Sequence, residues 1–205
     1  MALIRKATQP PAPTADVADP LCLLQAPDPS TRAHAAQRLA LQPGDATVAA
    51  ALLDTLAGEP EAAVRERLLT ALIVHADTGV AARLAVLLRQ ADAPRRTELV
   101  DALRQMPDAF HPLVPGLLAD PDPDLRIHVL STLDECPAPQ VRQWLVAVLE
   151  HDPHVNVCAG AVEILARIGE PAQLPALHRL KARFPDAAFI AFAADLAAAR
   201  IQGHA

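Results

Sequence analysis

The side chains that could do chemistry gather in one short segment of the chain. His151 and His154 stand beside Glu150 and Asp152, and Cys158 follows four residues later. Imidazole and carboxylate groups can ligate zinc, but a metal site needs at least a third convergent ligand. Because the segment falls on a predicted turn, local hydrogen bonding explains the histidines equally well. We therefore predict neither a metal site nor a bound cofactor.

Nucleophiles are scarce. Serine occurs only at Ser30 and Ser131, and neither lies in a G-x-S-x-G turn. Cys158 could act only with a histidine in contact, which spacing does not show, and a small, partly buried thiol is the alternative. The seven glycines form no phosphate-binding loop. We predict no catalytic residues and a protein that is not an enzyme.

Composition limits the kinds of partner that the chain could bind. Hydrophobic residues make up 52% of the 205 residues but aromatic residues only 2%, so helix-forming Ala and Leu dominate. The net charge is −6 and no run of basic residues occurs, which argues against nucleic acid as a partner. Three cysteines without a C-x-x-C pair fit a reducing compartment. With no signal sequence and no apolar stretch of membrane-spanning length, the predicted location is cytoplasmic, with no membrane contact.

The elements that must position these residues repeat with a period of about 31 residues. Six positions, each assigned to the start of the second helix of a unit, define the period: Arg32, Arg65, Arg96, Arg126, Val157 and Phe189. Turns rich in Pro and acidic residues separate the two helices of each unit, with Pro ending the first helix and an acidic residue complementing the dipole of the second. The apolar stripes of one helical pair need neighbouring pairs to cover them, so the pairs must stack.

We therefore predict an all-α superhelix of about six antiparallel helical pairs over residues 20–205. The leucines and isoleucine predicted to be buried are Leu53, Leu56, Leu72, Leu84, Leu87, Leu103, Leu117, Leu133, Leu145 and Ile164. Residues 1–19 lie outside the period and form a flexible, Pro-rich N-terminal segment. This segment is either a frayed tail or a docking peptide that uses Leu3 and Ile4 beside Arg5 and Lys6.

Two segments carry a family resemblance. Residues 120–126 (DPDPDLR) and 162–171 (VEILARIGEP) resemble HEAT repeats of the short bacterial kind, which also occur in phycobilisome lyase-like proteins. The resemblance implies a HEAT-repeat α solenoid. It also implies a ladder in which an acidic residue stands six before an arginine, as Glu59 does before Arg65 and Asp120 before Arg126. Tetratricopeptide repeats fit less well, because their aromatic signature positions are absent.

The exposed face of the second helices supplies the candidate partner-binding residues. Positions opposite the buried stripe hold mainly polar side chains, and this row lines the concave side of HEAT arrays. The candidates on this face are His34, Arg67, Glu98, Asp101, His128 and Glu135. An ordinary solvated face is the alternative. His154 and Asn156 join the list because they break the repeated turn, although a repeat near the end of an array can also drift.

The last helix, residues 187–201, is apolar nearly all round and adds Phe189 and Phe192 to the candidates. We assign Ala194 and Ala198 to its exposed side. An exposed apolar helix at the end of an array is expected to dock a partner or a second copy of the chain, which would give a homo-oligomer. A plain cap of small alanines is the alternative.

These observations predict a non-catalytic protein–protein interaction scaffold or adaptor in a bacterial cytoplasmic complex or regulatory pathway. The alternative, which follows from the repeat type alone, is a phycobilisome lyase-like or chaperone-like protein that acts on a chromophore-bearing protein. A HEAT-like DNA glycosylase is disfavoured, since the chain is acidic and lacks a basic, aromatic-lined groove.

Overall fold

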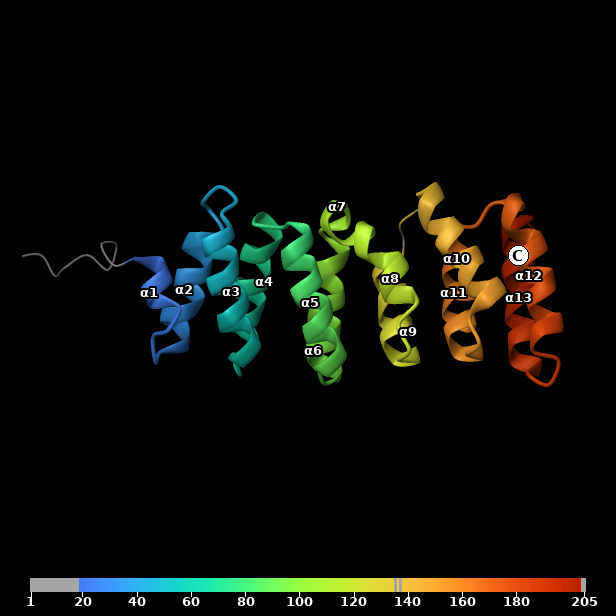
Figure 1. Cartoon of the computed structure of the whole chain (residues 1–205), viewed down its shortest axis with the longest axis horizontal. Coiled ribbons are helices and arrows are strands. Elements are labelled where there is room, and N and C mark those ends of the chain that lie inside the picture. The colour runs from blue at the N-terminus through green and yellow to red at the C-terminus, as the bar shows by residue number, and fades with distance from the viewer. Residues whose placement is uncertain (1–18, 135, 137, 204–205) are drawn as a thin grey trace, which may run out of the picture.

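The computed structural model describes residues 19–134, 136 and 138–203, and the described residues form helices and turns with no strand. The helices stand side by side in an elongated row that runs from the N-terminal to the C-terminal end (Figure 1). Six helical units follow one another along it, as predicted: α1 (Pro20–Leu23) and α2 (Pro29–Leu39); α3 (Ala46–Gly58) and α4 (Ala62–Val74); α5 (Thr78–Gln90) and α6 (Ala93–Arg104); α7 (Pro107–Phe110), η1 (His111–Leu113), α8 (Val114–Leu118) and α9 (Pro123–Thr132); α10 (Pro139–His151) and α11 (Val155–Ile168); η2 (Pro171–Gln173), α12 (Leu174–Arg183) and α13 (Ala188–Ile201).

Aspartates begin six of these helices. Each accepts a hydrogen bond from a backbone N–H of the first turn, which satisfies donors that have no partner inside the helix. The six N-caps are Asp19, Asp28, Asp45, Asp77, Asp92 and Asp122. Pro29 and Pro123 are the first residues of the second helices α2 and α9. In these turns proline therefore starts the second helix, whereas the sequence pattern assigned it to the end of the first.

The turns inside the units lie along one long edge of the molecule, the lower edge in Figure 1, and the links between units lie along the opposite edge. We call the first of these the turn edge. Proline also breaks the first helix of unit 4 into the short pieces α7, η1 and α8, because Pro107, Pro112 and Pro115 each lack a backbone N–H. No helix in the described part of the chain is long and apolar enough to cross a membrane.

One continuous apolar core runs through the array. Eight of the ten predicted core residues are buried: Leu53, Leu56, Leu72, Leu84, Leu103, Leu133, Leu145 and Ile164. The prediction was wrong for Leu87 and Leu117, which are half-buried. Both face hollows between units. Leu117, on the short helix α8, lines a groove between α8 and α5, so part of its side chain stays exposed.

A histidine that the sequence analysis did not single out joins units 1 and 2. His75, at the end of α4, is 4% exposed. Its Nδ1 accepts a hydrogen bond from the Asp45 backbone N–H at 3.0 Å, so Nε2 carries the proton and donates to the Leu39 carbonyl at 3.0 Å. One neutral ring therefore links the end of α2, the start of α3 and the end of α4.

Candidate functional site

Three of the four anchor arginines of the repeat bind neighbouring units together. Each of these three is on the first turn of a second helix, where Nη1 donates to a carbonyl of its own turn while Nε and Nη2 reach a carboxylate of the next unit. Nε of the fourth, Arg96, donates to a backbone carbonyl instead. Arg32 binds Glu59 at 2.7 and 2.8 Å, and Arg126 binds Asp152 at 2.7 and 2.9 Å. The paired charges hold the pKa of Glu59 below its ordinary value, because Arg32 donates to its ionised form.

The predicted ladder is therefore present with different partners. Within a unit, Arg65 does not reach the Glu59 carboxylate, nor Arg126 the Asp120 carboxylate. Each arginine instead donates to the backbone carbonyl of that acidic residue, at 3.4 and 2.7 Å. Arg65 pairs with Glu98 of the following unit, at 2.7 Å from both Nε and Nη2.

The structure also corrects the register of the last two units. In the first four units the anchor arginine stands four residues after the helix N-cap. The N-caps of α11 and α13 are His154 and Ala187. The equivalent residues are therefore Cys158, one after Val157, and Ala191, two after Phe189. The positions chosen from the sequence were one and two residues too early.

Cys158 occupies the place of an anchor arginine, and another arginine replaces the missing contacts. Its Sγ lies 3.6 Å from the carbonyls of Val148 and Asp152. Arg183 reaches in from α12 and donates to the carbonyls of Leu149 and Asp152. Burial raises the pKa of the Cys158 thiol, which disfavours the thiolate that a nucleophile requires. The geometry fits a structural thiol.

The two histidines of this turn do not converge on a ligand site. His151 is exposed, and its Nδ1 lies 3.0 Å from the Ala147 carbonyl. His154 is half-buried; its backbone N–H donates to Asp152, and its buried Nδ1 has no hydrogen-bond partner. Asp152 is already held by Arg126. Among the described residues, no three His, Cys, Asp or Glu side chains are placed to share a metal ion.

The predicted candidates on the second helices differ in accessibility. His34, Arg67 and Asp101 are exposed on α2, α4 and α6, as is Asn156 on α11. Glu98 is half-buried and engaged by Arg65. Two further candidates remain, His128 and Glu135. His128 is half-buried, and burial, together with Arg96, lowers its pKa. Glu135 lies outside the described residues.

With the corrected register, the buried and exposed sides of α13 are exchanged. Ala194 and Ala198, assigned to the exposed side, are buried at 2% and 6% exposure. The exposed side instead carries Phe189, Phe192 and Leu196, at 51%, 71% and 40%. Their spacing of three and four residues places them on one side of the helix. We call these three residues the phenylalanine stripe.

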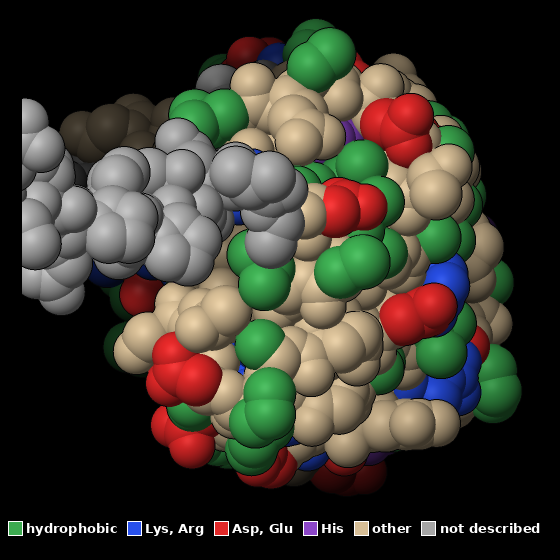
Figure 2. All heavy atoms as spheres, turned by 90° about the vertical axis from the view of Figure 1, so that its left-hand side faces the viewer, with side chains coloured by type: hydrophobic (Ala, Val, Ile, Leu, Met, Phe, Trp, Pro, Cys, Tyr) green, Lys and Arg blue, Asp and Glu red, His purple; other side chains and the backbone are tan. Residues whose placement is uncertain are grey.

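The stripe is not the surface on which a seventh unit would stack. Eight residues after the N-cap, the second helices of units 2 to 4 carry Leu69, Val100 and Leu130, all buried. The same position in α13 is Asp195, which is exposed and lies 2.6 Å from Lys181 Nζ. A charged pair therefore occupies the position that is apolar and buried in units 2 to 4. At the opposite end, apolar side chains are interspersed with carboxylates (Figure 2).

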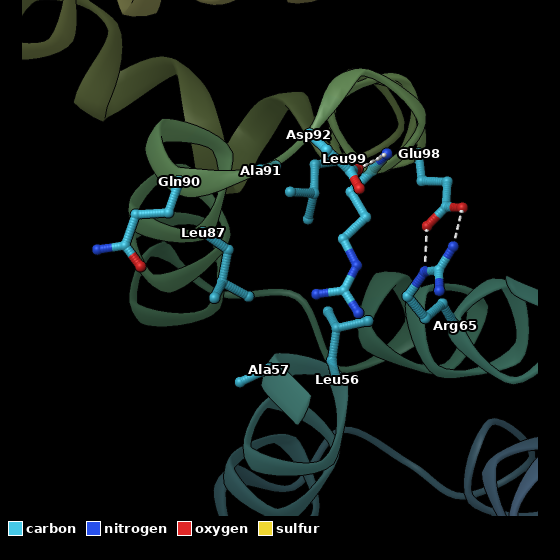
Figure 3. Close-up of a pocket in the computed structure, with 10 residues that line it drawn as sticks. Leu56, Ala57, Arg65, Leu87, Gln90, Ala91, Asp92, Glu98 and Leu99 are labelled. Carbon is cyan, nitrogen blue, oxygen red and sulfur yellow. Dashed lines mark hydrogen bonds and ion pairs between the residues drawn. The ribbon is translucent and has the colours of Figure 1, made fainter. Parts of the chain in front are cut away.

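The turn edge carries hollows between adjacent units. The groove between units 4 and 5 has a volume of about 750 Å³ and is lined by Trp144, Leu118, His151 and His154. Trp144 also meets His111 edge to face, with 5.4 Å between the ring centres. A smaller pocket of about 290 Å³ lies between units 2 and 3 (Figure 3). Sequence reasoning missed both hollows. For the groove between units 4 and 5, a signal was present in the sequence, namely the three prolines that break the first helix of unit 4.

A match to a known protein family agrees with this architecture. Residues 110–191 match the family model of HEAT repeats. The chain is similar to a crystal structure of an engineered protein, with 18% identity, coverage of 90% of this chain and 96% of that chain, and a TM-score of 0.41. It is also similar to the complex of CpcE and CpcF of phycocyanin lyase from Nostoc sp. PCC7120, with 16% identity, full coverage of both chains and a TM-score of 0.34. No curated protein matched the sequence.

Proposed function

Because the chain is a HEAT-repeat solenoid, we propose that it is a non-catalytic scaffold that binds a protein partner through the exposed face of its second helices. The phenylalanine stripe is the observation that carries this proposal. Large aromatic side chains exposed together on one helix are unusual in a chain whose aromatic content is only 2%. Aromatic residues of this kind dominate the binding energy of protein interfaces.

The fold itself does not require the stripe. Counted from the helix N-cap, the position of Phe192 is filled by Glu66 in α4 and Thr97 in α6, both exposed. The position of Leu196 is filled by Thr70 and Asp101 in the same helices, also exposed. Polar residues therefore serve the repeat equally well at these positions, and the apolar side chains of α13 support a role in binding.

The surroundings of the stripe suit an amphipathic helix as the partner element. A row of three apolar side chains spaced along one helix face offers the anchors that such a helix needs. The neighbouring face of α11 adds the half-buried Ala159, with the exposed Asn156 and Glu163 beside it as a polar rim. His34, Arg67 and Asp101 extend the same face toward the N-terminal end.

We place this activity in the cytoplasm of a bacterium, in a complex or regulatory pathway. The free state of Cys22, Cys136 and Cys158 supports a reducing compartment. The partner is either a different protein or a second copy of the chain. The charged pair of Asp195 and Lys181 disfavours stacking of two copies end to end, so a dimer would have to form through the stripe itself.

A capture experiment tests the proposal. Wild type, a Phe189→Ser and Phe192→Ser double variant, and a Val86→Ser control serve as baits in extracts of the source cell. Val86 is 61% exposed on a first helix, so the control also removes an exposed apolar side chain. We expect the double variant to lose a specific partner at least about tenfold while the control retains it.

Equal capture by all three baits would refute the role of the stripe. Light scattering on each purified bait separates self-association from binding of another protein. Tetrapyrrole absorbance in the captured material would identify a chromophore-bearing partner.

A further inference from the structure

The pocket between units 2 and 3 combines an apolar wall with charged groups (Figure 3). Leu56, Leu87 and Leu99 form the wall, together with Ala57 and Ala91. Two arginines and two acidic residues also line the pocket, namely Arg65, Arg95, Asp92 and Glu98. The pairing of these four charges decides what the pocket can bind.

One guanidinium in this pocket has no carboxylate partner. Arg65 already binds both oxygens of Glu98 at 2.7 Å and the Pro60 carbonyl at 2.6 Å. Arg95 is half-buried, and toward the described residues its side chain donates one hydrogen bond, from Nη2 to the Glu59 carbonyl at 2.6 Å. A guanidinium carries five N–H donors, so Arg95 keeps donors for a ligand.

The repeat explains why a carboxylate is missing here. Six residues before the anchor arginine, units 2 and 4 carry Glu59 and Asp120. Unit 3 carries the neutral Gln90 at that position, exposed at the rim of the pocket. The remaining carboxylate, Asp92, caps α6 by accepting from the Arg95 backbone N–H at 3.1 Å.

We propose that this pocket binds the free C-terminus of a partner polypeptide whose last residue is aliphatic. The C-terminal carboxylate meets Arg95 in a charge-assisted pair, and the last side chain packs against the leucines. A volume of about 290 Å³ is large enough for a chain end. Asp92 at the rim disfavours ligands with additional carboxylates. This site lies on the turn edge, so it is independent of the phenylalanine stripe.

Three short peptides and three variants test the proposal. The probes are acetyl-Ala-Ala-Leu with a free carboxylate, the same peptide with an amidated end, and the amidated peptide acetyl-Ala-Glu-Leu-Ala with an internal carboxylate. Binding is followed by NMR through the leucine methyl and arginine Nε–H signals of the protein. We expect the free carboxylate to bind at least about tenfold more tightly than either amidated peptide.

The variants separate the pocket from general charge effects. Arg95→Gln removes the guanidinium and is expected to lose binding of the free-carboxylate peptide at least about tenfold. Gln90→Glu supplies an internal carboxylate, so it is expected to lose the same binding without a fall in unfolding temperature. Arg200→Gln, at an exposed arginine far from the pocket, is the control and is expected to bind as wild type does. Equal binding of the amidated peptides, or retained binding by Arg95→Gln, would overturn the proposal.

Discussion

Replacing Asp152 by Asn tests the charge ladder at its most buried rung. The Asp152 carboxylate is 5% exposed, and it accepts from Arg126 at 2.7 and 2.9 Å and from the His154 backbone N–H at 2.8 Å. The Arg126 side chain is 7% exposed. Asn keeps the size of the side chain but removes its charge and directs an N–H₂ group toward the guanidinium donors.

The expected loss follows from this geometry. Removing one partner of a buried ion pair costs about 3–5 kcal/mol, because the other charge stays buried without compensation. The Asp120 carbonyl still accepts from Arg126 Nη1 at 2.7 Å, so we expect a loss near the lower limit, about 3 kcal/mol. Asp54→Asn is the matched control. Asp54 pairs with Arg83 on the surface, with 67% and 53% of the two side chains exposed, and such pairs contribute about 0–1 kcal/mol.

Urea unfolding with two probes measures the difference. Far-ultraviolet circular dichroism follows all helices, while fluorescence follows Trp144, the one tryptophan of the sequence, which lines the same groove as Asp152. We expect Asp152→Asn to lower the midpoint by both probes and Asp54→Asn to leave it nearly unchanged. Equal losses in the two variants would refute the claim that the buried ladder stabilises the array.

Three further predictions concern stability. Leu133→Ala should cost about 2–5 kcal/mol, and Leu117→Ala clearly less because Leu117 is half-buried, as urea unfolding of each variant will show. His75→Ala should cost about 1–3 kcal/mol by leaving the Asp45 N–H and the Leu39 carbonyl without their partner, and His75→Gln should lose less; thermal unfolding measures both. Burial lowers the pKa of His111 and His128, so the unfolded chain takes up protons first and stability should fall as the pH drops below about 6.5, which unfolding midpoints at a series of pH values will test.

The repeat could be predicted because its signals are local. Helical periodicity, Pro and Asp turns and leucines at fixed offsets follow from residues close together in the sequence, and the family match and the six stacked units confirm that prediction. The ladder partners could not be predicted in the same way. Arg65 pairs with Glu98 of the next unit because Gln90, six residues before the anchor arginine of that unit, is uncharged. This pairing depends on the packing of α4 against α6, which the sequence does not show.

The register of the last units failed for a related reason. Four second helices begin with an Asp or Glu N-cap, but α11 begins at His154 and α13 at Ala187. Without the acidic cap as a marker, the anchor was assigned one residue early in unit 5 and two in unit 6. That small error reversed the faces of α13, so the buried Ala194 and Ala198 were taken as exposed.

Site-specific photo-crosslinking in the source cell tests the central claim most directly. A photoreactive phenylalanine analogue replaces Phe192, at 71% exposure, or Val86, at 61% exposure on the first-helix face. The scaffold proposal predicts a discrete adduct with a different polypeptide from position 192 and none from position 86. No adduct from position 192, or the same adducts from both positions, would contradict it.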